Sequence, residues 1–106
     1  MFTRSAIFRG RLQEGMEEEF FEAVRTLLLP AWRQMLHAQE VRVYRPREAE
    51  GPGADVFLVQ EIDYPSRDHI AEALASDRRL AATEALASVR HMYEGGHYHI
   101  IYERIL

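Results

Sequence analysis

The sequence contains no cysteine, no lysine and no asparagine. Without cysteine the chain can form no disulfide, no thiolate nucleophile and no cysteine-ligated metal centre. Without lysine it cannot form a Schiff base with a carbonyl substrate. All thirteen basic residues are therefore arginines. The chemistry left to the side chains is that of histidine, arginine, carboxylates, amides and hydroxyls.

Positive charge and long apolar runs are missing as well. The formal net charge is −4, whereas a nucleic-acid partner requires a basic face, so we expect no nucleic-acid binding. No apolar run approaches the roughly 20 residues that cross a bilayer. The first residues also lack the apolar segment of a secretory signal. We therefore expect a cytoplasmic protein without a membrane partner.

The size and composition are those of one small globular domain. The chain has 106 residues, of which 47% are hydrophobic and 28% charged, so we expect a single domain over residues 1–106. A core of this size is modest. Burial of one face against a partner would add stability.

Alternation of apolar and polar residues predicts four strands. They cover residues 3–12, 40–45, 56–64 and 97–105. The third is the clearest, with Val56, Leu58, Gln60 and Ile62 on one side and Phe57, Val59, Glu61 and Asp63 on the other.

Apolar residues at spacings of three and four predict two helical regions. The first runs from Met16 to Leu36 and contains Pro30, which has no N–H for the preceding turn and predicts a kink or break. The second starts at the N-cap Ser66. It breaks and restarts at Ser76-Asp77 and ends at Gly95-Gly96.

The resulting order, βαββαβ, predicts an α+β protein of the ferredoxin-like class. Right-handed crossovers place both helices on one face of a four-stranded antiparallel sheet, with the second helix broken in two.

The other face of that sheet predicts a homodimer. It carries the apolar side chains of Ile7, Tyr44, Phe57, Val59, Tyr98, Ile100 and Tyr102, mixed with Arg9, Glu61 and Arg104. Such a patch is larger than monomers usually expose, and a second copy packed against it through a two-fold axis would bury it. We interpret the three charged residues as structural, with ion pairs across the dimer as one option. The alternative is that the face of one strand is assigned the wrong way round.

At this point the chain resembles the dimeric α/β-barrel superfamily, which includes antibiotic biosynthesis monooxygenases, EthD-like proteins and muconolactone isomerases. The resemblance lies in the element order, in the kinked helix from Phe20 through Pro30-Ala31-Trp32, and in the segment Tyr64 to Asp77. It implies a pocket between helices and sheet for a small substrate, often without a cofactor. Some relatives degrade haem with an asparagine that this chain lacks, so we expect no cofactor.

His97 and His99 are the first candidates for chemistry. Two residues apart on a strand, they point to the same face, the one that meets the helices. Such a pair can move protons, hydrogen-bond a substrate oxygen or bind metal. An H-x-H pair with no third ligand at a diagnostic spacing is weak evidence for metal, so we predict an acid–base pair and no metal site. The alternative is a half-exposed strand-end pair that is only hydrogen-bonded.

Three further residues are candidates for substrate binding. Gln60 is polar on an otherwise apolar strand face, and burying its amide without a partner costs about 1–3 kcal/mol. It should therefore bond a substrate, a water or a neighbour such as His99, or make only a strand-end hydrogen bond. Trp32 and Phe8 are expected between helix and sheet, as a pocket wall or simply as core.

We assign no catalytic or binding role to the other three histidines. His37 and His91 lie near the C-terminal ends of the two helical regions, where a cation is favoured. His69 falls in a first helical turn and is expected to be exposed.

Three functions remain open. The first is a small cofactor-independent enzyme, of monooxygenase, cyclase or isomerase type, acting on a hydrophobic aromatic, polyketide-like or lactone substrate. The second is a non-catalytic ligand-binding or accessory protein. The third is a structural dimer with a filled interior. A sizeable cavity lined by both histidines favours the first two.

Overall fold

The computed structural model describes all residues, 1–106. The strands are β1 (Phe2–Leu12), β2 (Val41–Tyr44), β3 (Val56–Tyr64) and β4 (Tyr93–Glu103). The helices are α1 (Glu17–Ala23), α2 (Leu29–Arg33), α3 (Arg67–Ala75) and α4 (Arg78–Ser88), with a π-helical turn at Val24–Leu28 and 3₁₀ turns at Gly51–Asp55 and Arg90–Met92. None of the helices has the length and apolarity needed to cross a bilayer.

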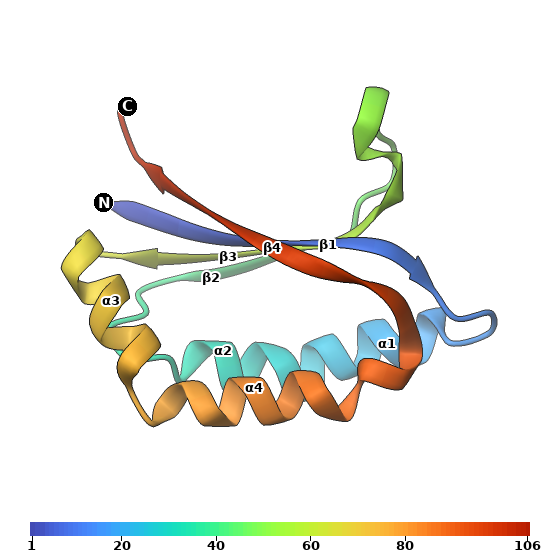
Figure 1. Cartoon of the computed structure of the whole chain (residues 1–106), viewed down its shortest axis with the longest axis horizontal. Coiled ribbons are helices and arrows are strands. Elements are labelled where there is room, and N and C mark those ends of the chain that lie inside the picture. Colours follow the sequence, from blue (N-terminus) through green and yellow to red (C-terminus); the bar gives the residue numbers. More distant parts are fainter.

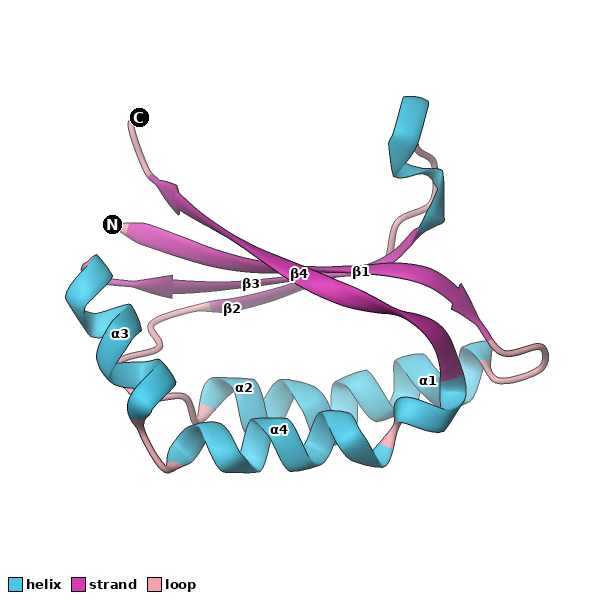
Figure 2. Ribbon diagram, viewed as in Figure 1, coloured by secondary structure: helices cyan, strands magenta, loops and turns pink.

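The strands form one antiparallel sheet in the order β2-β3-β1-β4. Figure 1 shows α1 and α2 end to end with α4 beside them, along one face of this sheet, and α3 at its end. No α-helix lies over the opposite face (Figure 2). The predicted ferredoxin-like fold is confirmed.

Pro30 changes the first helix without ending it. The N–H of Leu29 donates to the carbonyl of Val24, five residues back, in a π-helical turn directly before the proline. π-Turns are a common way to absorb an irregularity in a helix. The kink or break expected at Pro30 is therefore a widened helical turn. After it, α2 places Trp32 in the core.

The second helical region starts and breaks as predicted. The hydroxyl of Ser66 accepts the backbone N–H of His69 at 3.2 Å, which caps α3. The hydroxyl of Ser76 accepts the N–H of Arg78 at 3.2 Å, where α4 begins.

The predicted end of this region is wrong. Helix α4 ends at Ser88, and Gly95 and Gly96 lie inside β4, which starts at Tyr93. Gly95 pairs with Gly10 of β1, and both have positive φ, 122° and 132°. A Cβ on Gly95 would come within 2.0 Å of the Arg9 carbonyl oxygen. The two glycines thus permit a close backbone approach in a bent strand pair, and do not stop a helix.

The placement of Phe57 on the open face is also wrong. Phe8 pairs with Leu58 but the next residue, Arg9, pairs with Val56. This bulge leaves Phe57 as an extra residue that breaks the alternation. Its ring lies on the helix side, 5.6 Å from that of Phe20 and 5.2 Å from that of Tyr93, centroid to centroid.

Ion pairs on the open face are formed within the chain. Arg42, which the sequence analysis did not single out, donates to Asp63 at 2.7 Å and to Glu61 at 3.0 Å. The hydrogen bonds from Arg42, together with one from Thr3, hold the pKa of Asp63 below its usual value. Arg9 pairs with Asp55 at 2.8 Å, and Arg104 donates to the carbonyl of Leu106. The predicted structural interpretation of the charged residues agrees with these contacts.

We expect Gly95→Ala to destabilise the fold by about 2–5 kcal/mol, because the methyl group collides with the neighbouring strand and its φ is strained. Gly96→Ala is the matched control, since nothing lies within 4 Å of a Cβ there. It should change the free energy of unfolding by no more than about 0.5 kcal/mol. Urea unfolding of both variants tests this, and equal stabilities would contradict the close-approach explanation.

Candidate functional site

All five residues predicted from the sequence lie around one cavity between the sheet and the helices. Phe8, Trp32, Gln60, His97 and His99 line it, and its volume is about 90 Å³. His97 and His99 come from β4, Phe8 from β1, Gln60 from β3 and Trp32 from α2. Three strands and a helix thus bring together side chains that are up to 91 residues apart.

The cavity exists because a small residue occupies the middle of the sheet. Ala6 of β1 pairs with His99 of β4 on one side and with Gln60 of β3 on the other. The three residues form a row that faces the helices. Trp32 and Met35 also line the space. A methyl group at Ala6 does not fill the gap between the two longer side chains.

Aromatic rings form one wall of the cavity. Phe8 and Trp32 are buried in the core. The imidazole of His97 packs against the ring of Phe8, with centroids 4.8 Å apart and planes tilted by 30°. His97 and His99 lie edge to face at 5.1 Å. The pair therefore sits at the exposed edge of β4, with one ring held against the core.

The amide of Gln60 is free for a ligand. The residue is only 5% exposed, and its side chain makes no hydrogen bond within the chain, whereas its backbone carbonyl accepts the hydroxyl of Ser5 at 3.1 Å. The suggested bond to His99 is not formed. The amide lines the cavity without a partner in the chain, so it can bond a polar group of a ligand there.

Two arginines complete the lining, and the sequence analysis missed both. Arg4 makes no hydrogen bond or ion pair, and Arg79 donates only to the carbonyl of Leu74, at 3.3 Å. No aspartate or glutamate lines the cavity. Arg4 could have been found, because it lies in phase with Ala6 and Phe8 on the apolar face of its strand.

The hydroxyl of Tyr64, which does not line the cavity, is another donor without an acceptor. It is buried and has no hydrogen-bond partner. Burial raises the pKa of this hydroxyl, while the charges of Arg4 and Arg79 act in the opposite direction. The lining of the cavity thus offers hydrogen-bond donors and positive charge, and no negatively charged group to meet them.

Both histidines have pKa values below the usual value of about 6.5, which favours the neutral imidazoles at pH 7. Burial, followed by the charges of Arg4, His97 and Arg79, lowers the pKa of His99 to about 4. Burial, Arg4 and Arg90 lower that of His97 as well. A neutral imidazole has one N–H donor and one nitrogen acceptor. An anion bound beside Arg4 would offset the positive charge and raise both pKa values.

The cavity is smaller than the pockets of roughly 300–1,000 Å³ that enclose drug-sized ligands. It continues, however, into an open depression of about 670 Å³ that shares Thr83, Leu86 and His97 with it. A ligand could place one end in the cavity and extend over His97 into this depression.

Solved structures with the same architecture cover nearly the whole chain. An EthD family protein from Bacillus halodurans has a TM-score of 0.74 at 15% identity, over 99% of this chain and 100% of that one. SnoaB, a cofactor-independent oxygenase from Streptomyces nogalater, has a TM-score of 0.65 at 14% identity, over 99% and 93%. A dimeric protein of unknown function with a ferredoxin-like fold from Bacteroides fragilis has a TM-score of 0.60 at 14% identity, over 97% and 95%.

The predicted resemblance is confirmed at the level of the fold. Proteins assigned to the antibiotic biosynthesis monooxygenases are also among the similar structures. No protein-family model matches the sequence, and no curated protein matches it significantly. Identities this low establish a shared fold and leave the activity to be argued from the site.

Proposed function

We propose that this protein is a small cofactor-independent enzyme that moves a proton on a hydrophobic substrate carrying a negatively charged oxygen. The observation that carries the proposal is the cavity itself. Two neutral imidazoles and two arginines without carboxylate partners line it, beside an aromatic wall. Aromatic, polyketide-like and lactone compounds that carry an acidic oxygen fit this description.

The cavity suggests one orientation of such a substrate. Its carboxylate or enolate oxygen lies between Arg4 and Arg79, where charge-assisted hydrogen bonds are strong. Its apolar part packs against Phe8 and Trp32, and the amide of Gln60 bonds a second oxygen. His99 and His97 then flank the reacting atoms.

The chemistry is proton transfer. The anion raises the pKa of His99, whose imidazole takes a proton from the carbon next to a carbonyl. The electron pair of that C–H bond moves to the carbonyl oxygen, and Arg4 stabilises the resulting enolate. The imidazolium returns the proton at another carbon or oxygen. An isomerase or cyclase needs nothing more, whereas a monooxygenase also consumes dioxygen.

The second candidate is a ligand-binding protein without catalysis. A pKa of about 4 for His99 makes it a weak base in the free protein, and this favours binding over turnover. Both functions use the same arginines and the same amide. They differ in whether the bound molecule exchanges protons with the imidazoles.

Two probes separate these candidates. Calorimetry with salicylate measures binding, and NMR in D₂O measures exchange of the enolisable C–H of phenylpyruvate for deuterium. We expect Arg4→Gln to weaken salicylate binding by about tenfold or more, because a charge-assisted hydrogen bond contributes about 1.5–3 kcal/mol. His99→Gln should abolish deuterium exchange. Arg67→Gln, an exposed arginine on α3, is the control and should change neither.

Salicylate binding without any catalysed exchange would leave the ligand-binding protein as the function. Absence of both in the intact protein would contradict the two candidates together.

We also propose that the protein is a homodimer through the open face of the sheet. Tyr44, Tyr98, Ile100 and Tyr102 are 40–47% exposed there, although all are large and apolar. The charged residues on this face already have partners within the chain. The dimeric protein from Bacteroides fragilis has the same fold, which supports a second copy as the occupant.

Strand β4 supports the same proposal. Its eleven residues form an edge of the sheet, and nearly all are exposed. A long apolar edge strand invites aggregation unless something covers it. A second copy would cover both this edge and the aromatic face beside it.

We expect sedimentation to give twice the chain mass of 12.4 kDa. Ile100→Arg should shift the protein to monomers, because it places a charge in the proposed interface. Leu80→Glu is the matched control, since Leu80 is 61% exposed on α4, in the helix layer on the other side. A monomeric parent protein, or a dimer that only Leu80→Glu dissociates, would contradict this interface.

A further inference from the structure

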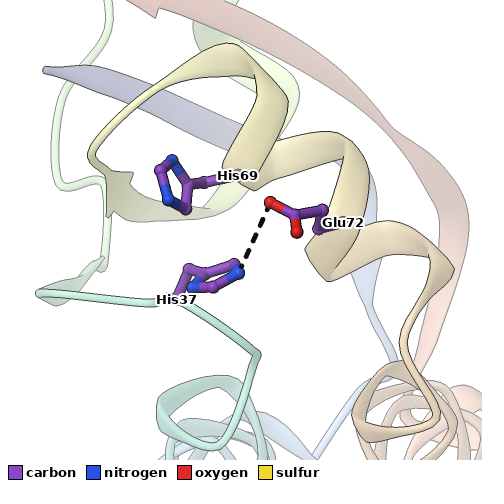
Figure 3. A group of neighbouring side chains, drawn as sticks. All are labelled: His37, His69 and Glu72. Atoms are coloured by element: carbon purple, nitrogen blue, oxygen red, sulfur yellow. Dashed lines mark ion pairs between the residues drawn. The ribbon is translucent and has the colours of Figure 1, made fainter.

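We propose that His37, His69 and Glu72 form a binding site for a divalent transition-metal ion of the Zn²⁺ type. One ligand atom from each residue lies within 4.8 Å of the other two. Figure 3 shows His37, from the loop after α2, facing His69 and Glu72 on α3. None of the three lines the cavity, so this site is independent of the proposed function.

The chain conformation brings the ligands together. His69 and Glu72 are three residues apart on α3 and therefore share a helix face. His37 has φ of 65°, a left-handed conformation that is uncommon for residues other than glycine. Its ring stands edge-on to that of His69, with centroids 4.5 Å apart. Its Nε2 lies 3.6 Å from Glu72 Oε2.

Ser66 orients one of the imidazoles. Its hydroxyl oxygen lies 2.5 Å from His69 Nδ1 and also accepts the backbone N–H of His69. A protonated Nδ1 donates to this oxygen and leaves the lone pair of Nε2 free for a metal. Metal-binding histidines usually have such a partner at the second ring nitrogen, because it fixes both tautomer and orientation.

The donor set suits zinc. Two imidazoles and a carboxylate, with water in the fourth position, are a known tetrahedral combination. Zn–ligand bonds of about 2.0–2.1 Å place neighbouring ligand atoms about 3.3 Å apart. The pair at 3.6 Å is already close to this, and the widest pair must close by about 1.5 Å. Glu72 is exposed and has no other ion-pair partner, so its side chain can make this movement.

A bound ion would join the loop after α2 to α3. These segments are separated in the sequence by β2 and β3, and the ion would connect them directly. We therefore expect Zn²⁺ to raise the thermal unfolding temperature of the protein, as any ligand specific for the folded state does.

The test uses the full chain carrying His97→Ala, which removes the competing H-x-H pair from the cavity. Calorimetry with Zn²⁺ should give one ion per chain, and Co²⁺ should give the visible absorption of a tetrahedral site. His37→Gly removes one ligand in a conformation that suits glycine, and His69→Gln and Glu72→Gln remove the others. Each should weaken Zn²⁺ binding at least about tenfold, since loss of even an outer partner costs 10–100-fold.

His91→Gln is the control, because His91 is an exposed histidine outside the cluster. It should leave Zn²⁺ binding unchanged, and circular dichroism shows whether each variant is folded. The proposal is overturned if the His97→Ala protein binds no Zn²⁺, or if a folded His37→Gly variant binds it as tightly as its parent. It is also overturned if His91→Gln is the variant that abolishes binding.

Discussion

Aromatic rings hold the helices and the sheet apart at one end of the molecule, and the cavity depends on this spacing. Phe20 of α1, Phe57 of β3 and Tyr93 of β4 pack with centroid distances of 5.2–5.9 Å. Packing in a protein interior is dense, so a layer spacing set by large rings leaves space wherever a side chain is small. Ala6 is such a place, in the middle of the sheet. The cavity therefore forms because a cluster of large aromatic residues sets the layer spacing, and the small residue Ala6 does not fill it.

The same spacing determines the electrostatics of the site. Arg4 and the two histidines line the cavity beneath the helices, and no carboxylate lines it with them. The pKa values of both histidines are lowered there, by burial first and then by neighbouring charges such as that of Arg4. The free protein thus holds positive charge and unused donors around a small apolar space. A bound anion would satisfy the donors and at the same time make the histidines more basic, so in the proposed enzyme one charge would couple binding to catalysis.

Period-two patterns and cap residues were sufficient to predict much of this structure. The bounds of β3, the cap at Ser66 and the break at Ser76 follow from local chemistry, and the side of β4 that carries His97 and His99 follows from alternation. Phe57 and Gly95 were misplaced because a bulge and a glycine pair are features of two strands together. The sequence of one strand does not reveal them.

The arginines of the site illustrate the same limit. Arg4 lies on the apolar face of its strand, so its alternation alone could have indicated it. Arg79 reaches the site through the packing of helix on sheet, which no periodicity describes. The approach of His37 to His69 similarly depends on one left-handed residue after α2. Interactions between distant elements are the part of the site that the sequence did not predict.

We propose that His99 is kept neutral by a site built to receive an anion. The most direct measurement is an NMR titration of the His99 imidazole, first in the free protein and then with saturating salicylate. We expect the His99 imidazole to become protonated only as the pH falls through about 4 in the free protein, and to have a clearly higher pKa with salicylate bound. An ordinary pKa of about 6.5 that salicylate does not change would contradict it.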